Sequence, residues 1–92
     1  MLTTLAEILV AARRGRYAVP AFDVVEDVMV RAVLETCSRR RAPAVLMALP
    51  GPDLDENGWR YIPGLVRAVA EHHDVPVALH LDHATELEDI ER

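Results

Sequence analysis

Three ionisable side chains stand together at the end of an apolar segment. The stretch HLDHA, residues 80 to 84, follows VPVAL and places Asp82 directly before His83 and two residues after His80. Imidazoles bind zinc and exchange protons near neutral pH, and a carboxylate beside them can act as a general acid or base. This spacing predicts either a metal site with an acid–base carboxylate or a cluster that only supports the fold.

His80 and Asp82 also have purely structural interpretations. Side chains alternate between the faces of a strand, so His80 and Asp82 would share a face, and His83 would point away unless the strand ends before it. His80 could be a hydrogen-bonded core histidine, and Asp82 could cap the helix that follows. Two histidines alone do not specify a metal. The residues by themselves leave these interpretations open.

Helices and strands alternate along the chain that carries this cluster. Apolar periodicity and turn residues predict helices over 4–14, 23–40 and 59–73 and from residue 85 onward. The helix over 59–73 could start at either residue 59 or residue 62. Strands are predicted over 17–22, 44–49 and 75–82. Strands that alternate with helices indicate βα units and a parallel sheet.

Capping residues refine the expected helix ends. Thr4 with Glu7, and Thr85 with Glu88, have the spacing of a capping box, in which two side chains satisfy backbone N–H groups at a helix start. Gly15 is expected to end the first helix in the left-handed conformation.

The ends of the three predicted strands should meet at one rim. Parallel α/β folds place active sites at the carboxyl ends of their strands, where this chain has FD, PG and HLDH. A three-stranded parallel sheet has exposed edges, and a full (β/α)8 barrel needs about 250 residues. We therefore expect the chain to be the beginning of something longer or to associate with partners.

Composition narrows the class of protein. The chain has 92 residues, of which 51% are hydrophobic and 27% charged, as in a small globular domain without a membrane span. Its net charge of −5 argues against general affinity for nucleic acid, and the basic cluster at residues 39–41 indicates a solvated helix end. Cys37 is the one cysteine and is expected to be a buried thiol, and no residue is lysine.

Three segments carry a family resemblance: GRYAVPAFDV, RAPAVLMALPG and VPVALHLDHATELEDI. Together they resemble the N-terminal part of class II, metal-dependent ketose-bisphosphate aldolases, which include the fructose- and tagatose-1,6-bisphosphate enzymes. The tagatose branch is the most similar in spacing. The resemblance implies an α/β fold in which residues 1–92 belong to a single (β/α)8 (TIM) barrel domain, as an N-terminal helix and the first three βα units of an incomplete barrel.

The resemblance also implies roles for the residues at the rim. His83 matches the first of three zinc ligands, Asp82 matches the acid–base that exchanges a proton with the substrate C4 oxygen, and His80 matches a supporting histidine beside the site. The zinc polarises a carbonyl and stabilises an enediolate. The other ligands and a phosphate-binding glycine loop are expected beyond Arg92. The missing lysine fits, because the other aldolase class needs a lysine Schiff base.

Two positions depart from the family pattern. Asp23 stands where the family usually has a substrate-binding asparagine, and a carboxylate cannot donate the same hydrogen bond. Leu49 stands where the family usually has serine or threonine, which removes a hydroxyl. Altered substrate preference and loss of activity are both consistent with these changes.

The resemblance implies a cytoplasmic lyase of carbohydrate metabolism, such as glycolysis. It would cleave a ketose 1,6-bisphosphate reversibly to dihydroxyacetone phosphate and glyceraldehyde 3-phosphate, and its full-length relatives would be homo-dimers or homo-tetramers. The sequence does not choose between fructose and tagatose bisphosphates. We expect the 92-residue chain alone to be inactive and to bind zinc weakly. The alternative is an inactive relative that serves as a folding unit or a self-associating α/β module.

Overall fold

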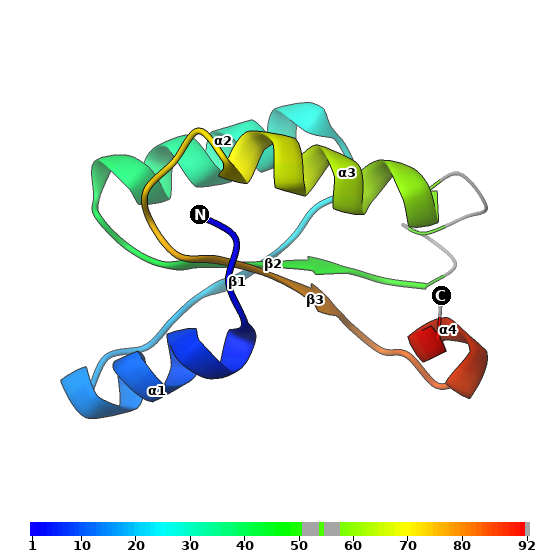
Figure 1. Ribbon diagram of the computed structural model, residues 1–92, viewed down its shortest axis with the longest axis horizontal. Coiled ribbons are helices and arrows are strands. Elements are labelled where there is room, and N and C mark those ends of the chain that lie inside the picture. Colours follow the sequence, from blue (N-terminus) through cyan, green and yellow to red (C-terminus); the bar gives the residue numbers. More distant parts are fainter. Residues whose placement is uncertain (51–53, 55–57, 92) are drawn as a thin grey trace.

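The computed structural model describes residues 1–50, 54 and 58–91. In these ranges the chain forms, in order, α1 (Leu5–Gly15), β1 (Ala21–Asp23), α2 (Asp27–Arg39), β2 (Ala44–Ala48), α3 (Gly58–Ala70), β3 (Val77–Leu81) and α4 (Leu87–Glu91) (Figure 1). The predicted alternation of helix and strand is confirmed. None of these helices has the length and apolar character needed to cross a membrane.

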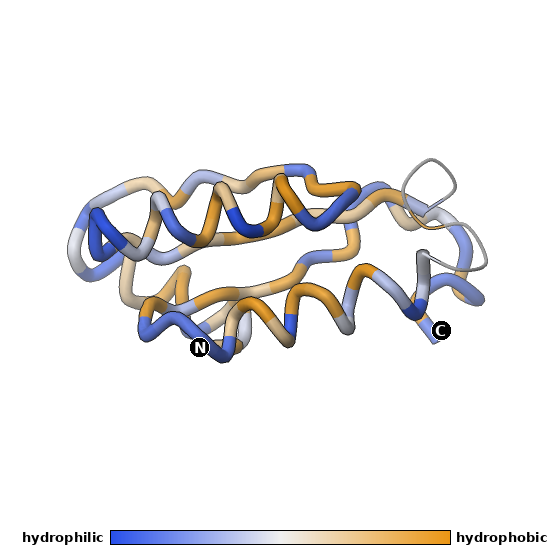
Figure 2. Tube along the Cα trace, turned by 90° about the horizontal axis from the view of Figure 1, so that it is seen from above, coloured by the Kyte–Doolittle hydropathy of each residue, from blue (hydrophilic) through white to orange (hydrophobic). Residues whose placement is uncertain are grey.

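The three strands form one parallel sheet in the order β1-β2-β3. Helices α2 and α3 cover one face of the sheet and α1 lies against the other (Figure 1). Seen from above, α2 and α3 run side by side along the sheet, and apolar and polar positions alternate along each of them (Figure 2). The arrangement is that of consecutive βα units in which the sheet has not closed on itself.

The central strand β2 is buried on both faces, as its unbroken apolar sequence predicts. Leu46 packs with Leu34 and Ile62 in the core between the sheet and helices α2 and α3, and all three side chains are fully buried. Val45 packs on the other face, against α1. The buried Cys37 lies in the first of these cores, and burial raises the pKa of its thiol.

The second helix begins later than the sequence predicts. Asp23 belongs to β1, in register with Met47, and the next N–H along the chain, that of Val24, donates to the Met47 carbonyl at 3.0 Å. Pairing with β2 thus keeps the chain extended through a stretch whose periodicity is helical. The helix then starts at Asp27, where the Glu26 side chain accepts a hydrogen bond from the Met29 N–H at 2.9 Å.

The start of α1 follows the predicted cap in part. Thr4 is the N-cap residue, and its hydroxyl accepts a hydrogen bond from the Glu7 N–H at 3.2 Å. The Glu7 carboxylate does not complete a capping box, because it accepts a hydrogen bond from the hydroxyl of Thr3 instead.

The end of α1 corrects the role expected of Gly15. Gly15 is the last helical residue, and the left-handed residue is Arg16, with φ 55° and ψ 49°. A Cβ on residue 15 would lie 2.6 Å from the ring of Tyr17, so glycine is favoured there for space. The left-handed turn therefore falls on a residue with a side chain, which costs conformational energy.

Replacing Arg16 with glycine is expected to raise the free energy of unfolding by about 1 kcal/mol, because glycine adopts the left-handed conformation without a Cβ clash. The matched control is Arg14→Gly, which removes the same charge from the same helix end but places glycine inside the last turn. It should lower the free energy by about 0.5–1 kcal/mol. Urea denaturation measures both, and equal effects of the two changes would contradict the assignment.

The later elements also differ from their predicted bounds. The third helix begins at Gly58 and passes through Pro63, so the proline does not set its start. The last helix begins at Leu87, two residues after the expected cap Thr85. Most of the turn predicted after β2, including Gly51, lies outside the described residues.

The N-terminal segment covers the beginning of β3. The N–H of Val77 donates to the Met1 carbonyl at 2.8 Å, and the N–H of Thr3 donates to the Val77 carbonyl at 2.7 Å. The amino group of Met1 donates to the carbonyls of Ala70 and Val75 at 2.9 Å each. This positive group therefore lies where the carbonyls at the end of α3 are exposed, which is favourable.

Candidate functional site

The carboxyl ends of the three strands lie along one edge of the sheet, which we call the rim. Asp23 ends β1, Leu49 follows β2, and Asp82 and His83 follow β3. Because the strands are parallel and in sequential order, these residues converge on the side of the fold where parallel α/β proteins bind their ligands.

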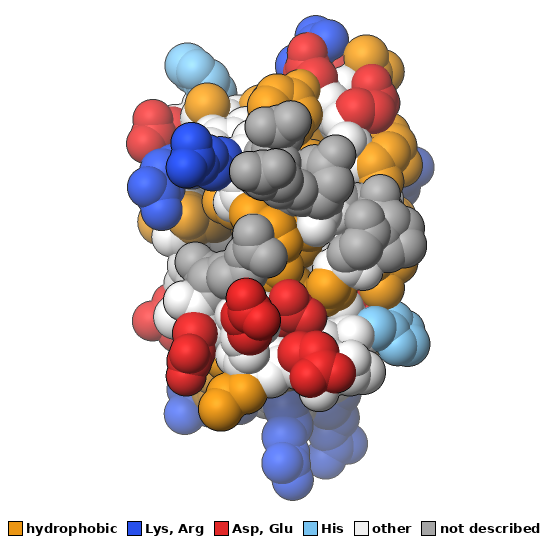
Figure 3. Space-filling view, turned by 90° about the vertical axis from the view of Figure 1, so that its right-hand side faces the viewer, with side chains coloured by type: hydrophobic (Ala, Val, Ile, Leu, Met, Phe, Trp, Pro, Cys, Tyr) orange, Lys and Arg blue, Asp and Glu red, His pale blue; other side chains and the backbone are white. Residues whose placement is uncertain are grey.

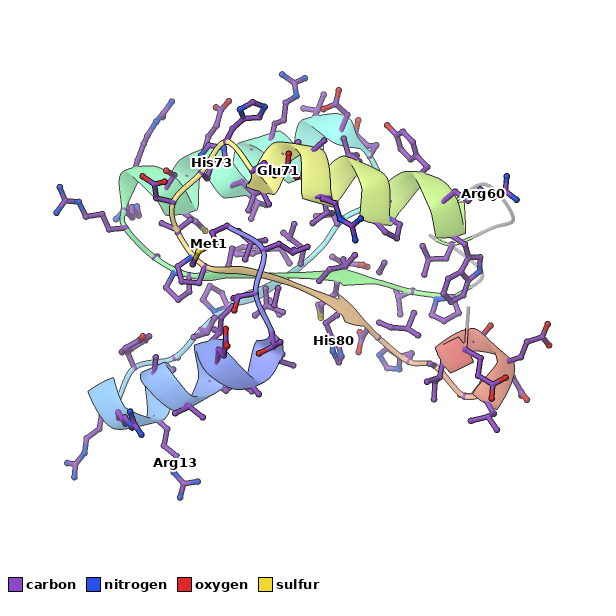
Figure 4. All side chains as sticks on the ribbon, in the orientation of Figure 1. Met1, Arg13, Arg60, Glu71, His73 and His80 are labelled. Atoms are coloured by element: carbon purple, nitrogen blue, oxygen red, sulfur yellow. The ribbon has the colours of Figure 1, made fainter. Side chains whose placement is uncertain are left out.

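Three of the residues near the rim form a row across one face of the sheet. Asp23 is in register with Met47, and Met47 is in register with His80. Met47 packs with the cluster on the α1 side of the sheet, and Figure 4 shows His80 pointing to that same side. The face that would line the interior of a barrel thus carries a carboxylate, a thioether and an imidazole at the same level.

The two histidines approach the same carboxylate. His80 Nε2 lies 3.7 Å from one oxygen of Asp82, and His83 Nε2 lies 3.5 Å from the other. The N–H of Asp82 donates to the Ala48 carbonyl at 2.9 Å, which fixes this residue against the end of β2. The carboxylate therefore lies between two imidazole rings, each within ion-pair distance, at the mouth of the sheet.

The backbone of His83 explains this convergence. β3 ends at Leu81, and His83 adopts a left-handed conformation with φ 55°. A continued strand would have turned the His83 ring to the opposite face. The left-handed residue instead reverses the chain and brings the ring back to Asp82. Such strain in a non-glycine residue costs roughly 1–3 kcal/mol and is typical of functional sites.

The exposed fractions of the side chains decide between the interpretations of the sequence. His80 is 41% exposed, so it does not belong to the core that the described residues form. Asp82 is 29% exposed and lies well before the start of α4 at Leu87, so it does not cap that helix. His83 is 78% exposed at the rim, where a ligand can reach it.

The residues present fit only part of a metal site. The described ranges contain no group of three or more His, Cys, Asp or Glu side chains that could hold a metal ion. The exposed imidazole of His83 is a suitable single ligand, whereas catalytic zinc usually takes three protein ligands. Beyond His83, a complete zinc site at this rim would need ligands other than those that the described ranges bring together.

Charge is divided between the two ends of the sheet. Six exposed arginines lie in or just after the last turns of α1 and α2, at the end opposite the rim; we call this the arginine end (Arg13, Arg14, Arg16, Arg39, Arg40, Arg41). At the rim, Figure 3 shows acidic side chains gathered where α4 lies, and Glu86, Glu88 and Glu91 are exposed there. The sequence shows each cluster, but the fold is needed to bring the arginines of two helices to the same end.

Comparisons with known proteins agree with this fold. Residues 3–92 match the family model described as fructose-bisphosphate aldolase class-II. The chain is similar to the structure of the YdjI aldolase from Escherichia coli K12, with 23% identity and a TM-score of 0.86 over 99% of this chain and 35% of that one. It is also similar to a protein from Coccidioides immitis assigned as a fructose-1,6-bisphosphate aldolase, with 26% identity and a TM-score of 0.76 over 95% and 32% of the two chains. The chain therefore spans about a third of the length of these structures.

Proposed function

Because this chain belongs to the class II fructose-bisphosphate aldolase family, we propose that it supplies one side of the active site of a metal-dependent aldolase. The reaction is the reversible cleavage of a ketose 1,6-bisphosphate to dihydroxyacetone phosphate and glyceraldehyde 3-phosphate. The observation that supports this proposal is the position of the Asp82 carboxylate between His80 and His83 at the carboxyl end of β3.

Asp82 is suited to the proton transfer of this reaction. In the cleavage direction Asp82 would accept the proton of the C4 hydroxyl while the C3–C4 bond breaks. The electron pair of that bond would pass to the enediolate of the triose, and C4 would become the aldehyde carbon. The carboxylate is partly exposed, so a substrate can reach it. The hydrogen bond from the Asp82 N–H to the Ala48 carbonyl limits the movement of the residue. In the reverse direction the same group would return the proton.

The histidines on either side would have different roles. His83, the more exposed, would supply one imidazole to a divalent metal, and such a metal supplies Lewis-acid stabilisation of negative charge on substrate oxygen. His80 would position the Asp82 carboxylate from the barrel-facing side of β3.

The substrate phosphates would depend on other parts of the barrel. Six arginines of this chain lie at the arginine end, away from the rim, and Arg31 is paired with Asp27 at 2.7 Å. Arg60 lies at the rim side of α3 (Figure 4). Asp23 adds negative charge near the proposed site and would disfavour a phosphate beside it. Fructose and tagatose bisphosphates differ in configuration at C4, so the choice between them would depend on the later loops that contact C4.

The family supports further proposals for the whole protein. We expect a cytoplasmic enzyme of carbohydrate metabolism that contributes to glycolysis or a related route, and a homo-dimer or homo-tetramer. The second candidate function is that of an inactive folding or association module. The carboxylate at Asp23 and the apolar Leu49, which replace the residues usual in the family, favour this alternative.

The test is to graft residues 1–92 into an active class II aldolase in place of its matching segment. The isolated chain should not cleave either bisphosphate with added zinc, whereas the grafted barrel should cleave one of them. His83→Ala in the graft should lower zinc content, measured by atomic absorption, and abolish cleavage, while the exposed rim change Glu88→Ala should leave both unchanged.

Two outcomes would count against the proposal. Cleavage by the isolated chain would refute the need for further strands. A grafted barrel that folds and binds zinc but stays inactive, even with Asp23→Asn and Leu49→Ser, would favour the inactive module.

A further inference from the structure

The residues that β1 and β2 bring to the rim have no hydrogen-bond donor in their side chains. Asp23, which ends β1, has a carboxylate that only accepts when it is ionised, and Leu49, which follows β2, is apolar. A fully ionised phosphate group also only accepts. These two side chains can therefore neither donate to a phosphate nor balance its charge, and the carboxylate would repel it.

Both side chains belong to the sheet face that would line a barrel. Phe22 packs against the core under α2 and α3, so the next residue, Asp23, points to the opposite face together with Met47. Leu49 is two residues beyond Met47 and precedes Pro50, which favours an extended backbone, so it should follow Met47 on that face. Asp23 is exposed there, and Leu49 is half-buried.

The other charged groups near β1 do not favour a phosphate either. Glu26 caps α2 and Asp27 lies in its first turn, so these carboxylates offset the partial positive charge of that helix end. Arg31 is paired with Asp27 at 2.7 Å. Arg60 extends from α3, which covers the opposite face of the sheet (Figure 4). Near the rim, the possible cations that the described ranges place on the face of Asp23 are the imidazoles at the end of β3.

The position of Asp82 indicates which end of a substrate would lie near Asp23. One oxygen of Asp82 faces His83 and the other faces His80. With C4 at this carboxylate, the carbons of the enediolate would lie on the side of His83, the proposed metal ligand, and the carbons from C5 onward on the side of His80. Asp23 is in the same row as His80, with the two Cα atoms about 10 Å apart, which is two strand spacings. The end of the substrate beyond C5 would therefore pass beside Asp23.

We propose that Asp23 is a specificity-determining residue. It shifts the preference of the site away from 1,6-bisphosphates and toward ketose 1-phosphates whose far end carries a free hydroxyl. The Asp23 carboxylate accepts a charge-assisted hydrogen bond from that hydroxyl, whereas a phosphate at the same place is repelled. Leu49 packs against the carbon chain. This inference rests on the aldolase proposal above and names the substrate class that suits this chain.

The bond changes are those of the proposed aldol cleavage. The C3–C4 bond breaks, its electron pair passes to the enediolate, and Asp82 accepts the proton of the C4 hydroxyl. The enediolate takes up one proton at C3, which balances the proton that Asp82 later releases, so no further reactant is needed. The products are dihydroxyacetone phosphate and a hydroxyaldehyde that carries no phosphate.

Kinetics of the reverse condensation test the preference. The grafted barrel is compared with its recipient aldolase, chosen to have asparagine at the position of Asp23. With dihydroxyacetone phosphate as the donor, kcat/KM is measured for glyceraldehyde 3-phosphate and for glyceraldehyde. The ratio of the first value to the second should be roughly 10- to 100-fold lower in the graft than in the recipient, the range expected for a hydrogen bond to a charged group.

Asp23→Asn in the graft should restore most of this ratio, and Leu49→Ser, which returns a donor, should raise it by a smaller factor. KM for dihydroxyacetone phosphate should stay the same, because that part of the substrate lies on the side of His83. The matched control is Glu26→Gln, which removes one charge from the same corner of the rim and keeps an oxygen to cap α2. It should change the ratio by less than about 2-fold, because exposed charges are screened. Circular dichroism and zinc content establish that the variants are folded.

The outcomes separate this inference from the aldolase proposal. A graft that condenses neither aldehyde, with or without Asp23→Asn, would refute both. A graft that is active only after Asp23→Asn, or whose ratio equals that of the recipient, would overturn this inference alone. The same holds if Glu26→Gln moves the ratio as far as Asp23→Asn, since the overall charge of the rim would then decide the preference.

Discussion

Replacing Leu46 with alanine should lower the free energy of unfolding by about 2–5 kcal/mol, because it leaves a cavity in a fully buried position. Leu46 is at the middle of the central strand, is 0% exposed, and packs against the core under α2 and α3. A domain of this size has a total stability of roughly 5–15 kcal/mol, so the loss would be a large fraction of it. Urea denaturation followed by circular dichroism measures the change.

The control for this prediction is Val28→Ala on α2. This change removes a smaller apolar side chain that is 59% exposed, and it should alter the free energy by no more than about 0.5 kcal/mol. If Leu46→Ala and Val28→Ala cost the same, the sheet does not pack on the two helices as described.

Asp82→Asn in the grafted barrel is expected to reduce kcat by about 10²- to 10⁴-fold, the usual contribution of a general acid–base. The amide has the size of the carboxylate but cannot take up the C4 proton. KM and the zinc content should change little, because the amide keeps the shape of the site and His83 is intact. Steady-state kinetics with each bisphosphate measure the split between kcat and KM.

Glu88→Gln provides the matched control, since it neutralises an exposed carboxylate of the same rim on α4. This variant should retain full kcat. A comparable loss of kcat in both variants would show that the charge of the rim matters and that Asp82 has no special role in proton transfer.

Much of the fold could be predicted because its signals are local. The apolar run of β2 and the periodicity of the helices depend on neighbouring residues. The differences arose where distant partners decide the conformation. Asp23 and Val24 stay extended because they pair with β2, and the chain turns helical only at Asp27. No local sequence pattern predicts the register in which β1 pairs with β2.

In the candidate site, too, local features could be predicted and contacts that depend on the folded backbone could not. The group of His80, Asp82 and His83 is visible in the sequence, and the family resemblance gave it a role. That both rings approach one carboxylate could not be predicted, because it depends on the left-handed conformation of His83. The alignment of Asp23 with His80 across Met47 likewise requires the sheet register.

The separation of the arginine end from the acidic rim gives the molecule a permanent dipole moment along its strands, in addition to its net charge of −5. The peptide dipoles of α1 and α2 point their negative ends at the arginines, so backbone and side chains partly cancel there. A negatively charged surface would repel the chain at long range but orient it at close approach, with the arginines foremost.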